Sequence, residues 1–199
     1  MKKIKMLISV IVILVAAFLY SHVAKMNMIY NKSIDNSEYL NMGEIDEKKV
    51  EQSFVCKEDS LDGVYIKCQL VGDVSEVMVY YTISDRADGS ILGEGKSRAS
   101  ELKDTKFNSF MLDTIEECKD RELFLTIWSE SKNDIGGVTY YFESDVEDGT
   151  ELYLDGNNVQ GTMIMKTITN RFDIETFCVL LVFILFIVGF MKILYKLFA

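Results

Sequence analysis

Two long uncharged stretches, one near each end of the chain, constrain this sequence more than any other feature. Residues 6–24 carry no charged side chain. A 19-residue helix of this kind is about 28 Å long, close to the roughly 30 Å of a bilayer core. Residues 176–191 are also uncharged, and apolar residues continue past Lys192 and Lys196 to Leu197. Because long lysine side chains can reach the headgroups, the sequence predicts membrane helices at 1–24 and 174–197.

A cleaved signal peptide is the competing interpretation of the first stretch. Signal peptides have a shorter apolar region and end in small residues. A cut after Ala24 would put His22 where a small residue is needed, and a cut after Ala17 would leave Phe18 at the new terminus. No cysteine lies near enough for lipoprotein processing. An uncleaved anchor is therefore favoured.

The charge distribution predicts which side of the membrane each part occupies. Residues 1–24 and 177–199 contain no acidic residue, and their basic residues are Lys2, Lys3, Lys5, Lys192 and Lys196. Residues 25–176 hold all 31 acidic residues against the other 16 basic ones, a net charge of −15. Positive flanks stay in the cytoplasm, so we expect both termini inside and the acidic middle outside. Because lysine and arginine dominate phosphate binding, a nucleic-acid partner is excluded.

The middle of the chain divides into a polar stalk and a strand-rich domain. Residues 25–49 are polar and lack sustained periodicity, so they predict a membrane-proximal stalk. From residue 50, short alternating segments are separated by Gly, Asp and Asn turns. The segments are 50–56, 63–70, 76–85, 91–95, 107–112, 122–130, 138–142, 151–154 and 159–169. This pattern favours an all-β fold, an antiparallel β-sandwich of eight or nine strands at 50–170.

Six short stretches carry a family resemblance. They are Gln52 to Phe54, Asp59 to Val64, Tyr80 to Asp85, Leu102 to Asp104 with Phe107 and Phe110, Leu123 to Ser129, and Tyr153 to Asn157. In this order they resemble a jelly-roll β-sandwich module that bacterial envelope proteins carry outside the cytoplasm. That module is associated with polytopic glycosyltransferase-like proteins of surface-polysaccharide systems. The resemblance implies a jelly-roll fold and a cell-envelope setting. This sequence departs from the family pattern in two ways: it has no polytopic portion, and the module carries three cysteines. The resemblance implies no site residues.

The residue types needed for familiar catalytic sites are scarce. The sole histidine, His22, lies at the outer end of the first apolar stretch, so a catalytic histidine or a histidine metal site in the outer domain is excluded. We therefore expect a chain that is not an enzyme. Acidic pairs occur at 59/62, 85/88, 116/117 and 145/148. They predict a solvated surface, with loop-bound Ca²⁺ as a secondary hypothesis and no other cofactor.

Aromatic residues are the candidate binding groups. If Leu123, Leu125 and Ile127 face the core, Trp128 points outward, and Tyr80 and Tyr140 can join it in an aromatic platform. Such rings stack on sugar faces with little loss of conformational entropy. The alternative is that the alternation is misjudged by one residue, in which case these rings fill the core. The sequence leaves both open.

The cysteines allow one disulfide outside the membrane. Cys178 lies in the second apolar stretch, and Cys68 shares a strand face with apolar residues and is expected in the core. Cys56 and Cys118 lie near strand ends and can pair in an oxidising exterior. A Cys56–Cys68 bridge is the rival pairing.

Together these features predict a membrane-anchored, non-enzymatic extracytoplasmic module. We expect it to bind glycan or to assist envelope polysaccharide assembly. The alternative hypothesis is a structural or regulatory subunit that its membrane helices recruit to a polytopic membrane protein. The expected partners are therefore the lipid bilayer and either a glycan or a membrane protein.

Overall fold

The computed structural model describes residues 2–43, 48–131 and 136–198. The chain divides into two compact units. Unit 1 comprises Met1–Lys25 and Asn170–Ala199, and unit 2 comprises Met26–Thr169.

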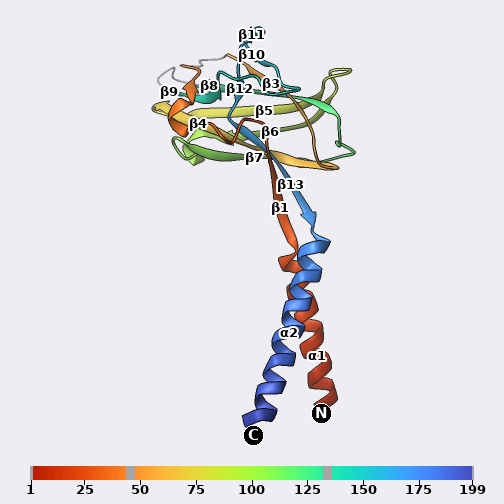
Figure 1. The fold of residues 1–199 in the computed structure, drawn as a ribbon. Helices are drawn as coiled ribbons and strands as arrows, with labels where there is room; N and C mark the ends of the chain where they lie inside the picture. The colour runs from red at the N-terminus through yellow and green to blue at the C-terminus, as the bar shows by residue number, and fades with distance from the viewer. Residues whose placement is uncertain (1, 44–47, 132–135, 199) are drawn as a thin grey trace. The chain divides into compact units, whose positions relative to one another are not determined.

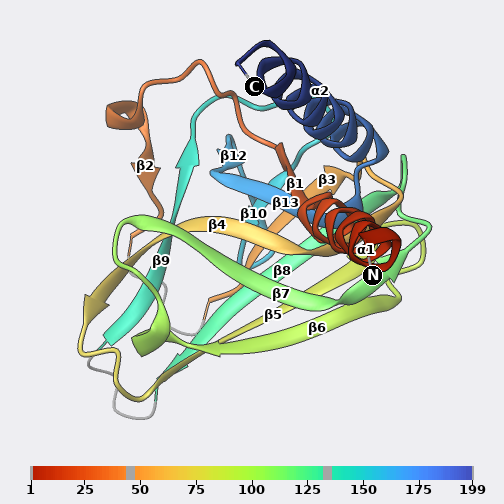
Figure 2. The ribbon, with the colours of Figure 1, turned by 90° about the horizontal axis from the view of Figure 1, so that it is seen from below.

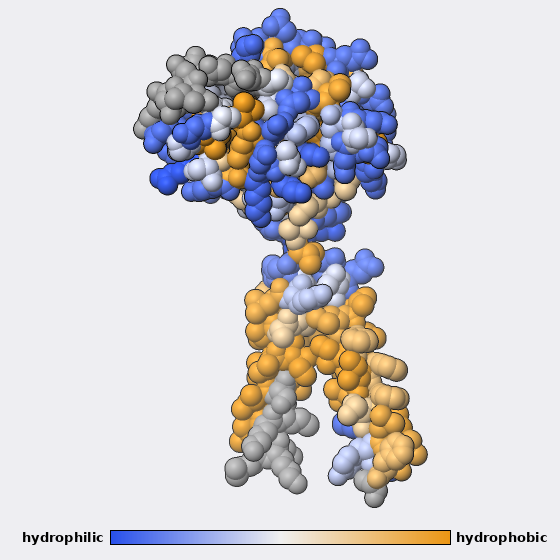
Figure 3. Space-filling model, turned by 90° about the vertical axis from the view of Figure 1, so that its left-hand side faces the viewer, coloured by the Kyte–Doolittle hydropathy of each residue, from blue (hydrophilic) through white to orange (hydrophobic). Residues whose placement is uncertain are grey.

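Unit 1 is a pair of contacting helices, α1 (Lys2–Tyr20) and α2 (Ile174–Phe198). The two chain ends lie at the same end of this pair (Figure 1). No residue described in α2 is buried, and the helix surfaces are largely hydrophobic (Figure 3). Of the described residues, only α2 forms a helix long and apolar enough to cross a membrane, and Val10–Tyr20 forms a shorter apolar helix. One of the two expected helices thus has the length and apolar composition of a membrane helix, and the two-pass expectation is not shown.

Hydrogen bonds within unit 1 fix the start of α2 to the end of α1. The Asp173 carboxylate accepts from the backbone N–H groups of Glu175 and Thr176, 3.0 and 3.3 Å away, and so caps the helix. The backbone N–H of Asp173 donates to the carbonyl of Ser21 over 2.8 Å. The ends of the two helices nearest the β-strands therefore lie together.

Unit 2 contains two antiparallel sheets, seen from below in Figure 2, except that β1 begins and β13 ends within unit 1. The seven-stranded sheet has the order β1-β13-β4-β9-β12, with β2 paired to β9 and β7 to β4. Its strands are β1 (His22–Met28), β2 (Leu40–Asn41), β4 (Ser60–Gly72), β7 (Lys106–Glu116), β9 (Gly136–Glu143), β12 (Thr162–Met163) and β13 (Met165–Phe172).

The six-stranded sheet has the order β11-β10-β3-β8-β5-β6. Its strands are β3 (Val50–Val55), β5 (Val77–Asp85), β6 (Ile91–Arg98), β8 (Glu122–Ser131), β10 (Leu152–Leu154) and β11 (Asn157–Val159). Among the described residues of unit 2, Asn36–Glu38 and Ala99–Glu101 form short 3₁₀ turns.

One hydrophobic core lies between the sheets. Alternate residues of β8 point into it, and Leu123, Leu125 and Ile127 have no exposed surface. The opposite sheet contributes residues such as Val64 and Phe110. Strong period-2 alternation in the sequence thus becomes a sheet with one apolar and one polar face.

The mainly-β prediction is confirmed, but the strand count was wrong. The described residues form thirteen strands rather than eight or nine. The expected strand at 159–169 is divided among β11, β12 and β13. The segment 25–49, expected to be a stalk, instead supplies β2 and part of β1 to the seven-stranded sheet. β1 and β2 bury none of their residues, so their segment lacks the alternation of buried apolar and exposed polar residues that marks a strand.

Candidate aromatic binding surface

The outward face of the six-stranded sheet carries a stacked aromatic pair. Tyr80 of β5 and Trp128 of β8 lie directly opposite each other in the strand register. Their ring centroids are 5.5 Å apart and the ring planes differ by 18°. Both side chains are half-buried. The pair therefore presents ring surface to solvent while each ring supports the other.

Two lysines extend this aromatic pair into a row across the sheet. Lys96 of β6 is the register partner of Tyr80 on its other side. Lys49 precedes β3, and its Nζ lies 5.4 Å from the centroid of the Trp128 ring. Cations at this distance from a ring centroid are attracted by its negative face. We call Lys49, Trp128, Tyr80 and Lys96 the aromatic row.

A polar row runs beside the aromatic row, two residues further along each strand. Thr82 pairs with Thr126 on one side and with Glu94 on the other, and Thr126 pairs with Glu51. Hydroxyls thus lie at the centre of this row and carboxylates at both ends. A hollow of about 370 Å³ opens over the part of the two rows that β5 and β6 carry. It is lined by Tyr80, Tyr81, Thr82, Glu94, Gly95, Lys96 and Trp128. This volume is within the about 300–1,000 Å³ typical of ligand pockets.

Glycine residues on β6 face the core, so the residues that alternate with them face outward. A Cβ at Gly95 would lie 2.4 Å from the ring of Tyr81, which is buried beneath it. A Cβ at Gly93 would lie 3.1 Å from Ile115. The inward positions of β6 are therefore filled by side chains from the neighbouring strands. Glu94 and Lys96, which alternate with these glycines, are exposed.

Tyr140 does not belong to this surface, so that part of the predicted platform was wrong. It lies on β9 in the other sheet and has no exposed surface. Its hydroxyl has no hydrogen-bond partner among the described residues, and burial raises the pKa of Tyr140 well above its ordinary value. The facing was misjudged because Tyr140, Tyr141 and Phe142 are consecutive, so β9 carries aromatic residues on both faces.

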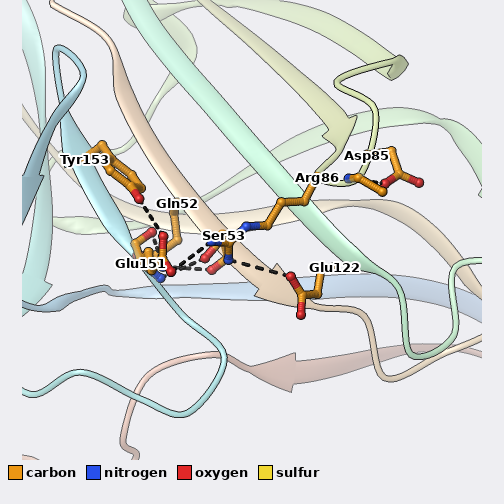
Figure 4. Close-up of polar contacts among 8 residues, drawn as sticks. Gln52, Ser53, Asp85, Arg86, Glu122, Glu151 and Tyr153 are labelled. Atoms are coloured by element: carbon orange, nitrogen blue, oxygen red, sulfur yellow. Dashed lines mark hydrogen bonds and ion pairs between the residues drawn. The ribbon is translucent and has the colours of Figure 1, made fainter.

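A second polar cluster lies at the opposite end of β8 (Figure 4). Arg86 donates to Glu151 over 2.8 Å and lies 3.7 Å from the Glu122 carboxylate. The Tyr153 hydroxyl donates to the other Glu151 oxygen over 2.5 Å. Hydrogen bonds, chiefly from Arg86, lower the pKa of Glu151.

Backbone contacts place this cluster in the framework of the fold. The Glu151 N–H donates to the Ser53 hydroxyl over 2.8 Å, and the Gln52 amide donates to the Glu151 carbonyl over 3.1 Å. Arg121 pairs with Asp85 nearby, and this hydrogen bond lowers the pKa of Asp85. Because these charged side chains pair with one another, we interpret the cluster as a structural contact between loops and strands and not as a reactive site.

The described residues show no cluster suited to a metal ion. No group of three or more His, Cys, Asp or Glu side chains among them is arranged to hold one. His22 lies in unit 1, where its Nδ1 is 2.9 Å from the carbonyl oxygen of Phe18. The calcium hypothesis thus gains no support from the residues that the structure describes.

The cysteines expected outside the membrane are all buried as thiols. Cys56 and Cys118 lie side by side and contact through their side chains. Cys68 accepts a hydrogen bond from the Asn108 amide over 3.1 Å. Burial raises the pKa of Cys68 and of Cys118 to about 11. Cys178 is exposed on α2.

Sequence reasoning missed Lys49, Lys96, Thr82 and Glu94 as neighbours of the aromatic pair. The alternation of Gly93 and Gly95 with Glu94 and Lys96 was a signal for the outward side chains of β6. Their position beside Tyr80 depends on strand pairing, which the sequence does not state.

Comparison with known proteins identifies no family. No family model and no curated protein matches the chain. Among solved structures, a clostridial cysteine protease, Cwp84 after propeptide cleavage, is similar with 11% identity and a TM-score of 0.38 over 74% of this chain and 40% of that one. The cysteine protease and lectin-like domains of Cwp84, a surface layer associated protein of Clostridium difficile, match with 13% identity and a TM-score of 0.33, over 62% and 32%.

A viral capsid protein also matches. The VP2 subviral particle of infectious bursal disease virus is 9% identical with a TM-score of 0.23, over 75% of this chain and 38% of that one. This chain spans less than half the length of each of the three similar structures.

The matches correct one expectation. The chain was expected not to be an enzyme, yet two of the similar structures belong to a cysteine protease. The expectation is withdrawn, because a single histidine excludes only histidine-dependent chemistry in the outer domain. TM-scores this low transfer no activity, so no protease reaction is assigned.

Proposed function

We propose that this chain is a membrane-anchored module that binds a glycan on the outward face of its six-stranded sheet. The stacked Tyr80–Trp128 pair carries this proposal. The ring surface of this pair matches the apolar face of a pyranose ring. Buried aromatic side chains normally serve a core, but these two are half-buried, paired and at the edge of a hollow.

The polar row supplies what a sugar needs besides a ring surface. Thr82 can donate and accept hydrogen bonds, Glu94 can accept them and Lys96 can donate them. Sugar hydroxyls are both donors and acceptors, so a mixed set of side chains beside an aromatic surface suits them. This chemistry supports a neutral or mixed-charge glycan more than a strongly anionic polymer, because the two lysines are balanced by Glu51 and Glu94.

We further propose that both helices cross the membrane and that unit 2 lies outside the cytoplasm. Three observations support this topology. α2 has membrane length, α1 contacts it, and the Asp173–Ser21 hydrogen bond joins the ends of the helices. The flanking lysines favour cytoplasmic termini. A jelly-roll sandwich and a role in envelope polysaccharide assembly are the finer proposals that the family resemblance adds.

The alternative function is a subunit that recruits a polytopic membrane protein through its helices. One observation favours it: the exposed side of α2 has an apolar hollow lined by Cys178, Val179, Val182, Phe183 and Phe186. Lipid chains fill such surfaces equally well, so we place this function second.

Binding of the full chain to a glycan array in detergent micelles tests the first proposal. We expect saturable binding that Tyr80→Ala and Trp128→Ala each weaken at least tenfold. Phe124→Ala is the matched control, because Phe124 lies on the same face of β8 but outside the hollow, and it should bind as the parent does. Absence of binding by a folded chain, together with co-purification of one membrane protein, would favour the alternative.

A further inference from the structure

Two cysteines from distant parts of the chain are held together at one edge of the core. Cys56 directly follows β3, and Cys118 lies in the loop between β7 and β8. The backbone N–H of Cys56 donates to the Arg121 carbonyl over 3.0 Å, and the N–H of Asp120 donates to the Cys56 carbonyl over 2.8 Å. These two bonds clamp the residue after β3 to the loop that carries Cys118.

The two thiols are also close and enclosed. Cys56 is 1% exposed and Cys118 is fully buried, and the two side chains contact each other. The Cys118 thiol donates to the Ile115 carbonyl over 3.1 Å, and the Cys56 thiol to the Glu58 carbonyl over 3.4 Å. Each thiol therefore contacts the other thiol as well as a backbone carbonyl.

The rival pairing with Cys68 is not compatible with this arrangement. Cys68 lies in β4, opposite Lys106 of β7 and Tyr140 of β9 in the register. Its sulfur is occupied by the Asn108 amide. A bridge from Cys56 to Cys68 would have to replace both this hydrogen bond and the contact between Cys56 and Cys118.

The loop around Cys118 has an unusual backbone. Glu117 and Asp120 have φ angles of +56° and +59°, a region that non-glycine residues adopt at a cost and only where surrounding contacts hold them. The Cys118 N–H donates to the Asp59 carbonyl over 2.9 Å, and the Arg121 N–H donates to the Cys118 carbonyl over 3.0 Å. Anchoring of Cys118 therefore keeps this loop in its conformation.

We propose that Cys56 and Cys118 form a disulfide, and that it is made while the domain folds rather than after it has closed. The oxidant is a disulfide of the exterior, either a dithiol oxidoreductase or glutathione disulfide. One cysteine thiolate attacks that disulfide and releases its first thiolate. The second cysteine then attacks the mixed disulfide and releases the other, so two electrons and two protons leave the chain.

Burial of the two thiols explains why the disulfide forms during folding. The thiolate is the attacking species, and the closed domain gives an oxidant no access to either sulfur. Desolvation raises the pKa of both thiols, for Cys118 to about 11, so few thiolates exist at neutral pH. In the unfolded chain both thiols are solvated and reactive. This inference needs an oxidising exterior but not glycan binding.

Counting free thiols in the full chain tests the pairing. Protein exported by cells, denatured and alkylated without reduction, should carry two labels, on Cys68 and Cys178, and four after reduction. Cys118→Ser should carry three labels under both conditions. Cys68→Ser is the control: it should still gain two labels on reduction, whereas loss of that gain would indicate a Cys56–Cys68 bridge. Four labels without reduction would overturn the proposal.

Two further measurements test the effect of the disulfide on stability and the stage at which it forms. The bridge closes a long loop, so oxidised chain should melt roughly 10 °C above reduced chain, and Cys118→Ser should remove the difference. Reduced native chain carrying Cys178→Ala, which removes the exposed cysteine, should keep its three buried free thiols for hours in glutathione disulfide. Urea below the unfolding midpoint should speed the loss of those on Cys56 and Cys118. Equally fast oxidation without urea would contradict formation during folding.

Discussion

The ring of Tyr81 packs edge-on against the ring of Phe110, with 5.2 Å between centroids, and so joins β5 of one sheet to β7 of the other. The Tyr81 hydroxyl donates to the Met111 carbonyl over 2.7 Å. Since neighbouring residues of a strand face opposite ways, this contact fixes Tyr80 on the outward face. The position of the proposed binding surface thus follows from a contact inside the core.

Replacing Leu125 by alanine should destabilise the chain strongly. Leu125 has no exposed surface and lies mid-strand in β8. Truncating a buried leucine typically costs about 2–5 kcal/mol through lost transfer energy and the cavity left behind. Thermal unfolding should show this loss, with Thr126→Ala as the outward-facing control within about 0.5 kcal/mol of the parent. The opposite ranking would mean that the facing of β8 is inverted.

Removing the Tyr140 hydroxyl should not harm the fold. A buried hydroxyl without a partner costs about 1–3 kcal/mol, so Tyr140→Phe should stabilise the chain by about 1 kcal/mol. Tyr81→Phe is the matched comparison, because it deletes the bond to Met111 and should cost about 1 kcal/mol. Chemical denaturation measures both. A clear loss of stability in Tyr140→Phe would show that the hydroxyl is hydrogen-bonded. Loss of glycan binding in this variant would mean that Tyr140 belongs to the binding surface after all.

Glu143→Gln should change how stability depends on pH. Glu143 has no exposed surface, and one of its oxygens accepts from the Asn31 N–H over 2.8 Å. The other has no partner among the described residues. Burial raises the pKa of Glu143 above its ordinary 4.5.

The direction of the pH effect on stability follows from proton binding by Glu143. The folded chain keeps the proton at a pH where the unfolded chain has lost it, so this group's stabilising contribution falls as pH rises above about 4.5 and through the raised pKa. The glutamine variant lacks that fall. Its melting temperature minus that of the parent should therefore grow from pH 4 to pH 8. A difference that stays constant with pH would refute the assignment.

Cysteine labelling from outside intact cells tests the proposed topology. A cysteine at exposed Ser144, in a Cys178→Ala background, should react with a membrane-impermeant maleimide. A cysteine at Lys3, or one added after Ala199, should react only after lysis. The background itself should remain unlabelled, since its other cysteines are buried. Labelling of either terminus in intact cells would reverse the orientation.

Local sequence patterns determined the class of this fold. Uncharged stretches at both ends are a property of consecutive residues, and so is the alternation that buries Leu123, Leu125 and Ile127. Such patterns act through the helix and strand periods alone, which is why the apolar C-terminal helix and the buried face of β8 could be read directly. The outward facing of Trp128 followed from the same alternation.

Only the tertiary structure decided which residues meet across strands. The register that sets Tyr80 beside Trp128 and Lys96 is fixed by packing between sheets, and no local pattern encodes it. Tyr140 was misplaced because aromatic residues at positions 140, 141 and 142 occupy both faces of β9, so the alternation in the sequence does not show which face is buried. The same long-range packing brings Cys56 to Cys118 rather than to Cys68, since loop closure and core burial, not separation in sequence, determine which thiols come into contact.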